Sequence, residues 1–462
     1  MINKKILLVD PCSITHGPPP VVKIQDKSLS AVYSQTLDRA INKRLNGSAD
    51  LHSQNAVSHH YISNYGLLIL GGLFREYGFD VEYINGDYYI NNDAFLNSAV
   101  EKAEMCETIC FTATTPQYMS VAHIASHIST LFPNKLLVFG GPHAYFFVTH
   151  SEPSPFHLIC VGHNAKLSSL KIKEMTIAGE IPVNSIVYLA DGYFDSPKDF
   201  SLIPSHFLKE TLLYSYVSFG CPNKCNYCVE RIFSKKVCSL MLESKIQEID
   251  FIVNKAKIRS VHLADSDFLL NYNLANDFLS LIERRKINCC FSINTSPRTI
   301  CRQESLILLK RFVQLGLVEI LIGIEYFSER ELAYMNKVYS IDKLHTTLQK
   351  IRELLPELII SFYSLIGLPG EDSKTISENI KWTSCFKNDQ LFDFSFPKFF
   401  VPYPGSDIFE HPDKYNVKIL HRKWNEYHRW SLPRPIKICD MAENTFIDEL
   451  VDLYNISHIT IN

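Results

Sequence analysis

The sequence predicts an α/β protein with a doubly wound parallel sheet, an incomplete six-unit parallel barrel and a short C-terminal segment. Two observations indicate this fold. Apolar strands alternate with helical patterns twice along the chain, once before residue 175 and again from residue 211. A stretch rich in Pro, Ser and Asp separates the two series and has the composition of a connector. A chain of 462 residues is also too long for one typical core.

The first series, over residues 1–175, begins with a continuous apolar strand at residues 4–9, as expected in a sheet covered on both faces. Residues 11–60 are expected to be an irregular insertion. A helix starts near Tyr65 and ends at Gly78, a typical helix-terminating glycine. Another helix is expected over residues 117–131. The remaining strands are expected at 81–85, 108–113, 135–140 and 158–162. In such a sheet, ligands bind at the carboxyl ends of the strands.

The second series follows a linker over residues 176–210 and occupies residues 211–405. Its strands are expected at 212–219, 259–264, 288–294, 318–324, 358–366 and 391–400, with helices that include 271–285, 303–315 and 374–386. Six such units predict an incomplete barrel whose chemistry lies in the loops at the carboxyl ends of the strands. Residues 406–462 are rich in aromatic side chains. They are expected to form either a lid over the barrel mouth or an aromatic plug packed on the barrel.

Three cysteines follow the first barrel strand in a C-x3-C-x2-C pattern: Cys221, Cys225 and Cys228. Thiolates select soft metals, and an iron–sulfur cube usually takes four of them, so three ligands leave one iron open. The alternative is a structural zinc site with Cys238 as the fourth ligand. The long, irregular interval before Cys238 favours the cluster.

This spacing, with Tyr227 directly before the third cysteine, resembles the radical S-adenosylmethionine (SAM) superfamily. The resemblance implies a [4Fe-4S] cluster whose open iron binds SAM and whose electron cleaves SAM to a 5′-deoxyadenosyl radical. It also implies SAM contacts near Tyr227 and at the later strand ends. The residues concerned are Tyr227, Asp265, Asp267, Asn294, Arg298, Gly323, Glu325, Gly367 and Leu368. For Asp265, a helix-capping role is the ordinary alternative.

Small and polar residues mark the carboxyl ends of the first sheet: Thr112, Thr114, Thr115 and Gln117 after its third strand, and Gly140, Gly141, Pro142 and His143 after its fourth. Glycines let a backbone approach a bulky ligand, and hydroxyls can bond a polar tail. The layout resembles the cobalamin-binding domain found ahead of many radical SAM barrels, which implies that these residues bind cobalamin. The Asp-x-His-x-x-Gly signature is absent, so no lower axial histidine is expected. A Rossmann-like domain without a ligand is the alternative, favoured by Gly162-His163-Asn164 in place of the family's acidic turn.

Taken together, the two resemblances imply a class B, cobalamin-dependent radical SAM methyltransferase. Such an enzyme would use methylcobalamin to methylate an unactivated carbon of a small metabolite or peptide, with an electron donor such as flavodoxin or ferredoxin. The same cofactors could instead serve a cyclisation or rearrangement. A third reading is a non-catalytic iron–sulfur or zinc-binding module.

Composition excludes several other classes. The formal charge of -3 comes from 46 basic and 49 acidic residues without a basic block, which argues against nucleic acid as a partner. No apolar stretch is long enough to span a bilayer. Thirteen cysteines without framework spacing indicate a reducing cytoplasm rather than disulfides.

Overall fold

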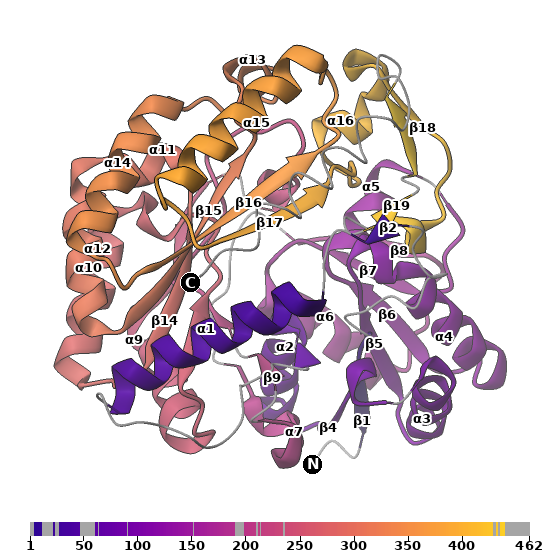
Figure 1. Ribbon diagram of the computed structural model, residues 1–462. Coiled ribbons are helices and arrows are strands. Elements are labelled where there is room, and N and C mark those ends of the chain that lie inside the picture. The colour runs from indigo at the N-terminus through magenta and orange to yellow at the C-terminus, as the bar shows by residue number, and fades with distance from the viewer. Residues whose placement is uncertain are drawn as a thin grey trace.

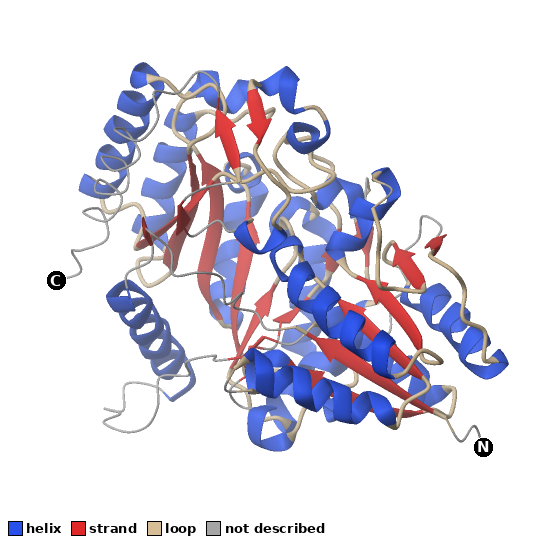
Figure 2. Ribbon diagram, turned by 90° about the vertical axis from the view of Figure 1, so that its right-hand side faces the viewer, coloured by secondary structure: helices blue, strands red, loops and turns tan. Residues whose placement is uncertain are grey.

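Two parallel sheets, each covered by helices, stand side by side in the structure, a computed structural model (Figure 1; Figure 2). The structure describes residues 4–11, 22–23, 27–46, 61–62, 64–89, 91–150, 152–189, 198–208, 211–212, 214–233, 236–427, 431–432 and 435–438. Within these residues, no helix is long and apolar enough to cross a bilayer. The α/β class expected from the sequence is confirmed.

The first sheet has six parallel strands in the order β4-β1-β5-β6-β7-β8. The strands are β1 (Lys5–Asp10), β4 (Asp80–Asn85), β5 (Thr108–Thr112), β6 (Leu136–Gly140), β7 (Leu158–Val161) and β8 (Ser185–Tyr188). Successive side chains point to opposite faces of a strand. Ile6 and Leu8 therefore pack in the core formed with α2 (Tyr65–Glu76) and α6 (Ala165–Ala178). Leu7 and Val9 pack in the core formed with α3 (Asn92–Glu104) and α4 (Tyr118–Leu131).

The second sheet also has six parallel strands, in the order β10-β13-β14-β15-β16-β17. They are β10 (Tyr214–Ser215), β13 (Ser260–Leu263), β14 (Cys290–Thr295), β15 (Leu317–Glu325), β16 (Ile359–Ile366) and β17 (Phe394–Phe399). The outer helices are α9 (Leu242–Asp250), α10 (Tyr272–Arg285), α12 (Gln303–Leu315), α14 (Ile341–Leu354) and α15 (Ser373–Asn388). Apolar side chains of these helices and of the outward strand positions form one core, as expected for a partial barrel.

Shorter elements connect or flank the sheets. They are β2 (Val22–Lys23), β3 (Tyr61–Ile62), η1 (Gly86–Tyr88), η2 (Thr115–Gln117), η3 (Pro142–Tyr145), α5 (Phe146–Thr149), η4 (Phe200–Leu202), α7 (Ser205–Leu208), β9 (Thr211–Leu212), β11 (Ser218–Phe219), α8 (Glu230–Phe233), β12 (Cys238–Ser239), η5 (Phe251–Lys255), η6 (Phe268–Leu270), α11 (Pro297–Ile300), α13 (Glu329–Tyr334), α16 (Asp407–Glu410), η7 (Pro412–Tyr415), β18 (Val417–Ile419), η8 (Trp424–Glu426), β19 (Ser431–Leu432) and β20 (Ile436–Ile438).

The expected irregular insertion at residues 11–60 contains a helix, α1 (Lys27–Asn46). Figure 1 shows α1 in indigo alongside the strands of the second sheet, far from its neighbours in sequence. Tyr33 makes edge-on contacts with the rings of Phe394 and Phe396 at 5.1 Å, and Ile41 packs with Cys290 and Val318. The helix α1 therefore covers part of the barrel sheet, where the sequence predicted irregular structure.

Two further expectations differ from the structure. The strand expected at 212–219 is divided among β9, β10 and β11, and only β10 joins the barrel sheet. The linker expected at 176–210 contains β8, which pairs with β7 as the sixth strand of the first sheet. Its side chains alternate between half-buried and exposed, so this edge strand lacks the continuous apolar run that marks a buried one.

Within the aromatic segment after residue 405, Tyr415 contacts Tyr334 of the barrel at 5.8 Å between ring centroids, whereas Trp424 and Tyr427 pack on the first sheet. Trp424 is almost fully buried and contacts His143 at 5.0 Å and Phe146 at 4.9 Å between ring centroids. Tyr427 is fully buried beside Trp424. For these two rings, both expectations, a lid over the barrel mouth and a plug packed on the barrel, are therefore wrong. His428 and Trp430 lie outside the described residues.

A buried charge cluster joins the two halves. Glu248 on α9 lies 3.0 Å from the Nζ of Lys198 and 3.3 Å from the Nζ of Lys245. Lys245 also donates to the hydroxyl of Tyr65 on α2, and Ser215 of β10 donates to Glu248 at 2.7 Å. We call these five residues the interdomain clamp. It ties α2 of the N-terminal half to the barrel and to the segment that connects the two halves.

Candidate active site

The three motif cysteines lie on one loop at the carboxyl end of the barrel sheet. Each is half-buried and free of disulfides. Hydrogen bonds hold the loop to the segment after β15. Asn226 donates its backbone N–H to Met335 O at 3.1 Å and a side-chain amide N–H to Tyr334 O at 2.8 Å. The amide of Asn336 returns a bond to Lys224 O. Segment 334–336 thus fixes the loop before any metal binds.

Burial raises the pKa of all three thiols, that of Cys228 to about 12. The three thiols are therefore protonated at neutral pH when metal is absent. A soft metal ion replaces these protons, and its positive charge offsets the free-energy cost of burying the negatively charged thiolates. Lys337 lies close enough to Cys225 and Cys228 for its charge to lower the pKa of both. Three thiols on an anchored loop beside a cation fit an iron–sulfur cluster.

Asp265 anchors the chain that leads into the cysteine loop. Its carboxylate accepts the backbone N–H of Val217 at 2.9 Å, and the N–H and hydroxyl of Ser218 at 2.6 Å each. The side chain is buried, which raises its pKa to about 6. These bonds occupy both oxygens, so the geometry favours a positioning role for Asp265 over the expected contact with SAM.

Two more expected SAM contacts are placed differently from the expectation. Asp267 is buried, with both oxygens bonded to hydroxyls, those of Thr295 at 2.9 Å and Thr299 at 2.6 Å. Arg298 is exposed on α11. The structure therefore favours a structural role for Asp267 and does not bring Arg298 to the buried polar groups at the strand ends.

Asn294 belongs to a row of polar groups on the inner side of the barrel. Its amide nitrogen lies 3.2 Å from His262 Nε2 and donates to Asp265 O at 3.2 Å. His262 Nδ1 in turn lies 2.8 Å from Ser292 Oγ. Burial lowers the pKa of His262 to about 4, so the ring is neutral at pH 7. This row runs from the sheet to the loop that holds Asp265.

Glu325 and Lys337 form an ion pair directly beside the cysteine loop. Their side chains are 2.8 Å apart and only about one-sixth exposed. A Cβ at Gly323 would lie 3.0 Å from Glu325 Oε1 and 3.3 Å from Lys337 Nζ, so the glycine leaves room for the pair. Lys337 also lies over the ring of Tyr227. The pair brings one negative and one positive group to the position expected for the polar tail of SAM.

The glycine-rich end of β16 is stabilised by its own carboxylate. Glu371 accepts the backbone N–H of Gly367 at 3.2 Å and of Leu368 at 2.8 Å. Gly367 has a φ of 72°, which favours glycine. Because Glu371 takes both N–H groups, any contact of Gly367 and Leu368 with SAM would have to use other atoms.

The carboxyl edge of the first sheet divides into an accessible layer and a buried layer. Gly140, Gly141, Pro142, Thr114 and Gln117 are at least partly accessible. The Oε1 of Gln117 accepts both the N–H and the hydroxyl of Thr114, at 2.9 and 2.6 Å. Thr112, Thr115 and His143 are buried. Gly141 has a φ of 85°, and a Cβ there would lie 2.3 Å from Thr112 Oγ1, so glycine is needed for the two loops to touch.

His143 differs from the expectation of a ligand contact. Its ring is fully buried among Tyr118, Phe146 and Trp424. Its Nδ1 lies 3.2 Å from Thr115 Oγ1, and its Nε2 has no hydrogen-bond partner among the described residues. Burial lowers its pKa to about 3. A ligand could reach this ring only if the aromatic cluster opened, so the structure favours a supporting role for His143.

The carboxyl edges of the two sheets meet at the cysteine loop. His163, which follows β7, contacts the ring of Phe219 at 6.1 Å, two residues before the first cysteine. Tyr145, which follows β6, and Ile232 both lie against Gly405, because a Cβ at Gly405 would lie 3.0 Å from Tyr145 Cδ1 and 1.9 Å from Ile232 Cδ1. Groups bound at the two edges would therefore be neighbours.

The loop after β7 explains the unusual Gly162-His163-Asn164 turn. Asn164 caps α6 by accepting the N–H of Leu167 at 3.1 Å. Gly162 has a φ of 128°, and a Cβ there would lie 3.1 Å from Leu189 Cβ. The three residues thus serve turn geometry, helix capping and contact with the barrel half.

Comparison with known proteins agrees with this geometry. Residues 215–383 match the family model of the radical SAM superfamily. The fold is similar to TsrM from Kitasatospora setae, a radical SAM methyltransferase solved with tryptophan and a SAM analogue, with a TM-score of 0.67 and 15% identity over 98% of this chain and 89% of that chain. It is also similar to OxsB, a cobalamin-dependent SAM radical enzyme solved with aqua-cobalamin and SAM, with a TM-score of 0.64 and 13% identity over 94% of this chain and 65% of that chain.

A relative similar in sequence is named for a different activity. It is the tRNA-2-methylthio-N(6)-dimethylallyladenosine synthase of Treponema denticola, 23% identical over 240 residues, or 48% of this chain. The chain spans about half the length of this relative, 49%. Sequence similarity thus supports the general chemistry and leaves the transferred group open.

Lys337 is the main residue of this site that the sequence did not identify. It lies twelve residues after Glu325, beyond α13, and no motif joins the two positions. The only available signal was a lysine in the loop after a strand end already marked by Gly-Ile-Glu.

Proposed function

Residues 215–383 of this chain form a radical SAM domain, and from that premise we propose that the protein is a cobalamin-dependent radical SAM methyltransferase. Its substrate is a small molecule or a peptide with an unactivated carbon. The radical SAM family implies a [4Fe-4S] cluster and SAM, and the cobalamin assignment rests on the first sheet and on the fold shared with OxsB and TsrM.

One observation carries the proposal most strongly: the two carboxyl edges meet. His163 of the first half contacts Phe219, and Tyr145 of the first half lies with Ile232 against Gly405. Phe219 and Ile232 flank the cysteine loop. When bound, the cluster with SAM supplies a carbon-centred radical, and cobalamin supplies a transferable methyl group. Neighbouring sites matter because a substrate radical must meet the methyl donor before it reacts elsewhere.

The residues of the chain have distinct tasks in this proposal. Cys221, Cys225 and Cys228 hold the cluster. Asp265 fixes the strand that leads to them through Val217 and Ser218. The ion pair of Glu325 and Lys337 holds the charged tail of SAM, because an amino acid zwitterion needs one partner of each sign.

At the other edge, the accessible backbone of residues 140–142, with Thr114 and Gln117, supports the corrin. Thr112, Thr115 and His143 brace these loops from beneath. Because His143 is enclosed by aromatic rings, cobalamin would bind without a histidine ligand from this loop.

Methylthio transfer is the second candidate, since the relative from Treponema denticola carries that activity in its name. It requires a sulfur atom in addition to the methyl group, and a sulfur donor held by further thiols is the simplest source. Among the described residues of the first half, the cysteines are Cys106, Cys110 and Cys160, all buried. This placement favours methyl over methylthio transfer. A rearrangement without methyl transfer would use the same cofactors.

The test is anaerobic turnover of the protein reconstituted with iron, sulfide and hydroxocobalamin, with a flavodoxin or chemical reductant as the electron donor. We expect 5′-deoxyadenosine and S-adenosylhomocysteine to form from SAM, both abolished in Cys225→Ala. Formation of 5′-deoxyadenosine alone, whether or not cobalamin is bound, would contradict methyl transfer and favour rearrangement. With a substrate in hand, the mass of the product separates a methyl group from a methylthio group.

A further inference from the structure

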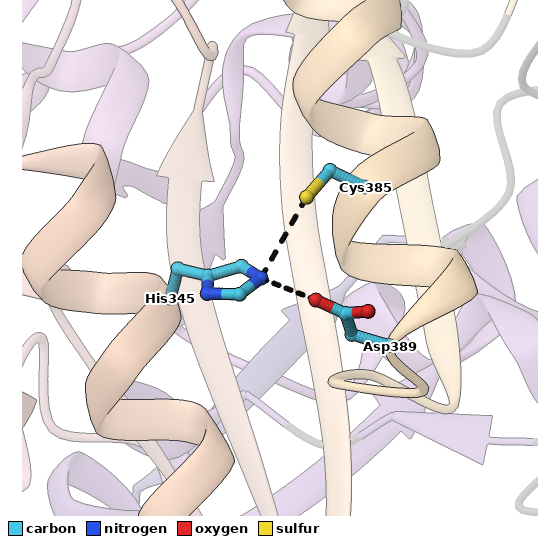
Figure 3. A group of neighbouring side chains, drawn as sticks. All are labelled: His345, Cys385 and Asp389. Carbon is cyan, nitrogen blue, oxygen red and sulfur yellow. Dashed lines mark hydrogen bonds and ion pairs between the residues drawn. The ribbon is translucent and has the colours of Figure 1, made fainter.

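Three side chains with metal-ligating atoms converge on the outer helical layer of the barrel: His345 on α14, Cys385 on α15 and Asp389 directly after α15 (Figure 3). The Nε2 of His345 lies 2.6 Å from Asp389 Oδ2 and 3.7 Å from Cys385 Sγ. All three ligand atoms lie within 4.8 Å of one another. None of the three has a task in the proposed reaction.

The local structure presents these atoms to a common point. Cys385 and Asp389 are four residues apart, so they share one face of α15, and the N–H of Asp389 closes the last helical turn on Cys385 O at 3.1 Å. The ring of His345 packs edge-on against Phe386 at 5.0 Å and near Trp382 at 6.4 Å. These aromatic contacts fix the imidazole, so the trio does not depend on flexible side chains.

Hydrogen bonding alone satisfies this arrangement poorly. One nitrogen of His345 faces both the carboxylate and the thiol, and a single N–H can be directed well at only one of them. The carboxylate of Asp389 also lies at the C-terminus of α15, where the helix dipole favours a cation over an anion. A bound cation would satisfy all three side chains and the end of the helix together.

We propose that His345, Cys385 and Asp389 bind one Zn²⁺ ion. Nitrogen, thiolate sulfur and carboxylate oxygen are the donors zinc prefers, and ligand atoms about 3.3–3.6 Å apart fit a tetrahedral ion with bonds of about 2.0–2.3 Å. The nitrogen–sulfur separation is already close to this range, and the nitrogen–oxygen separation must lengthen by less than about 1 Å. The oxygen and sulfur atoms, which lie within 4.8 Å of each other, must approach by about 1 Å at most. Because the side chain of Asp389 is 42% exposed, water can take the fourth position.

The charge of the site balances on binding. Cys385 releases its thiol proton to solvent, and the thiolate and carboxylate together neutralise the two positive charges of Zn²⁺. No electron is transferred. The ion would join α14 to the end of α15, two outer helices that the loop at 355–358 and strand β16 separate in sequence.

The alternative is a surface ion pair of His345 and Asp389 with a neighbouring thiol. Zinc content separates the two. Full-length protein with its cluster assembled is equilibrated with excess Zn²⁺ buffered by a weak chelator, and zinc and iron are counted per chain. We expect about one zinc per chain, and at least about 100-fold weaker zinc binding in Cys385→Ser and His345→Gln, because losing even an outer partner of a ligand costs 10–100-fold. Iron content should not change.

Cys301→Ser is the matched control, because Cys301 is half-buried beside Thr347 on α14 but belongs to no trio of metal-ligating side chains among the described residues. It should keep its zinc. Absence of zinc from the unaltered protein, or unchanged zinc in both ligand variants, would overturn the proposal.

A second measurement uses the unaltered chain, so it does not depend on folding of a variant. Alkylation of Cys385, followed by peptide mass, should slow at least about tenfold when Zn²⁺ is added, because a metal-bound thiolate is shielded. An unchanged rate would contradict the site. Neither readout involves SAM cleavage, so failure of the proposed function would leave this result intact.

Discussion

Replacing Glu248 of the interdomain clamp by Gln should destabilise the protein strongly. The carboxylate lies between two ammonium groups, 3.0 Å from Lys198 Nζ and 3.3 Å from Lys245 Nζ, and the three side chains are at most 2% exposed. The change Glu248→Gln keeps the shape but leaves two buried positive charges without their anion. Removal of one partner of a buried ion pair costs about 3–5 kcal/mol.

The penalty should depend on pH. Burial lowers the pKa of Lys198 to about 8 from its ordinary 10.5. Between these values the unfolded chain binds more protons than the folded one, so the stability of the protein rises with pH in this window. Once Lys198 is neutral, the absence of the carboxylate matters less. We therefore expect the cost of Glu248→Gln to be larger at pH 7 than at pH 9.

The assay is anoxic unfolding in denaturant at both pH values. Glu243→Gln is the control, since Glu243 lies on the same helix but its pairs with Arg284 and Arg285 are half-exposed, and it should cost less than about 1 kcal/mol. The double change Lys198→Met with Glu248→Gln should recover part of the loss by removing one orphaned charge. Equal costs for the two glutamine variants would refute the reasoning.

Three further predictions follow from single contacts. Changing any one of the cluster cysteines to Ala should remove most of the bound iron, whereas Cys238→Ala should retain it; retention in a cluster variant would reassign the ligands. Gly141→Ala should cost about 1–3 kcal/mol or more and reduce cobalamin retention, because of its φ of 85° and the 2.3 Å approach to Thr112. Gly179 has a φ of 70° but open space around it, so Gly179→Ala should cost only about 1 kcal/mol and leave cobalamin retention unchanged. Equal effects of the two variants would show that the contact between Gly141 and Thr112 is not the cause. Burial raises the pKa of Glu319 to about 7 from 4.5, so the folded state keeps its proton longer and stability falls as pH rises through this range. Glu319→Gln, which can still bond Tyr33 and Ser361, should abolish this fall and stabilise the protein by up to about 3 kcal/mol above pH 7, measured by unfolding against pH.

Apolar patterning predicted most strands of both sheets because most of them are buried on both faces. Strand β16, expected at 358–366, runs over Ile359–Ile366. Patterning failed where burial is one-sided. The helix α1 carries Tyr33, Leu37 and Ile41 at four-residue intervals, all on the face packed against the barrel. Polar residues such as Gln35, Asp38 and Arg39 lie between them, so no continuous apolar run marks the helix in the sequence.

Of the candidate site, the sequence could indicate the cysteines because their spacing is local. It could not indicate which polar residues are free for ligands. From the sequence, Asp265 could equally be a SAM contact or a helix cap. Only the fold shows that its oxygens, like those of Glu371, accept backbone N–H groups. The sequence likewise gives no sign that Lys337 pairs with Glu325, because only the fold brings the two side chains together. The approach of His345 to Cys385, forty residues away, depends wholly on how α14 and α15 pack.

The direct test of the account is the iron and cobalt content of the anoxic protein after reconstitution with hydroxocobalamin. We predict about four iron atoms, lost when Cys221 is changed to Ala, and one cobalt. Iron without cobalt would contradict the assignment of a cobalamin site to the first sheet. Zinc at the cysteine loop in place of iron would contradict the radical chemistry altogether.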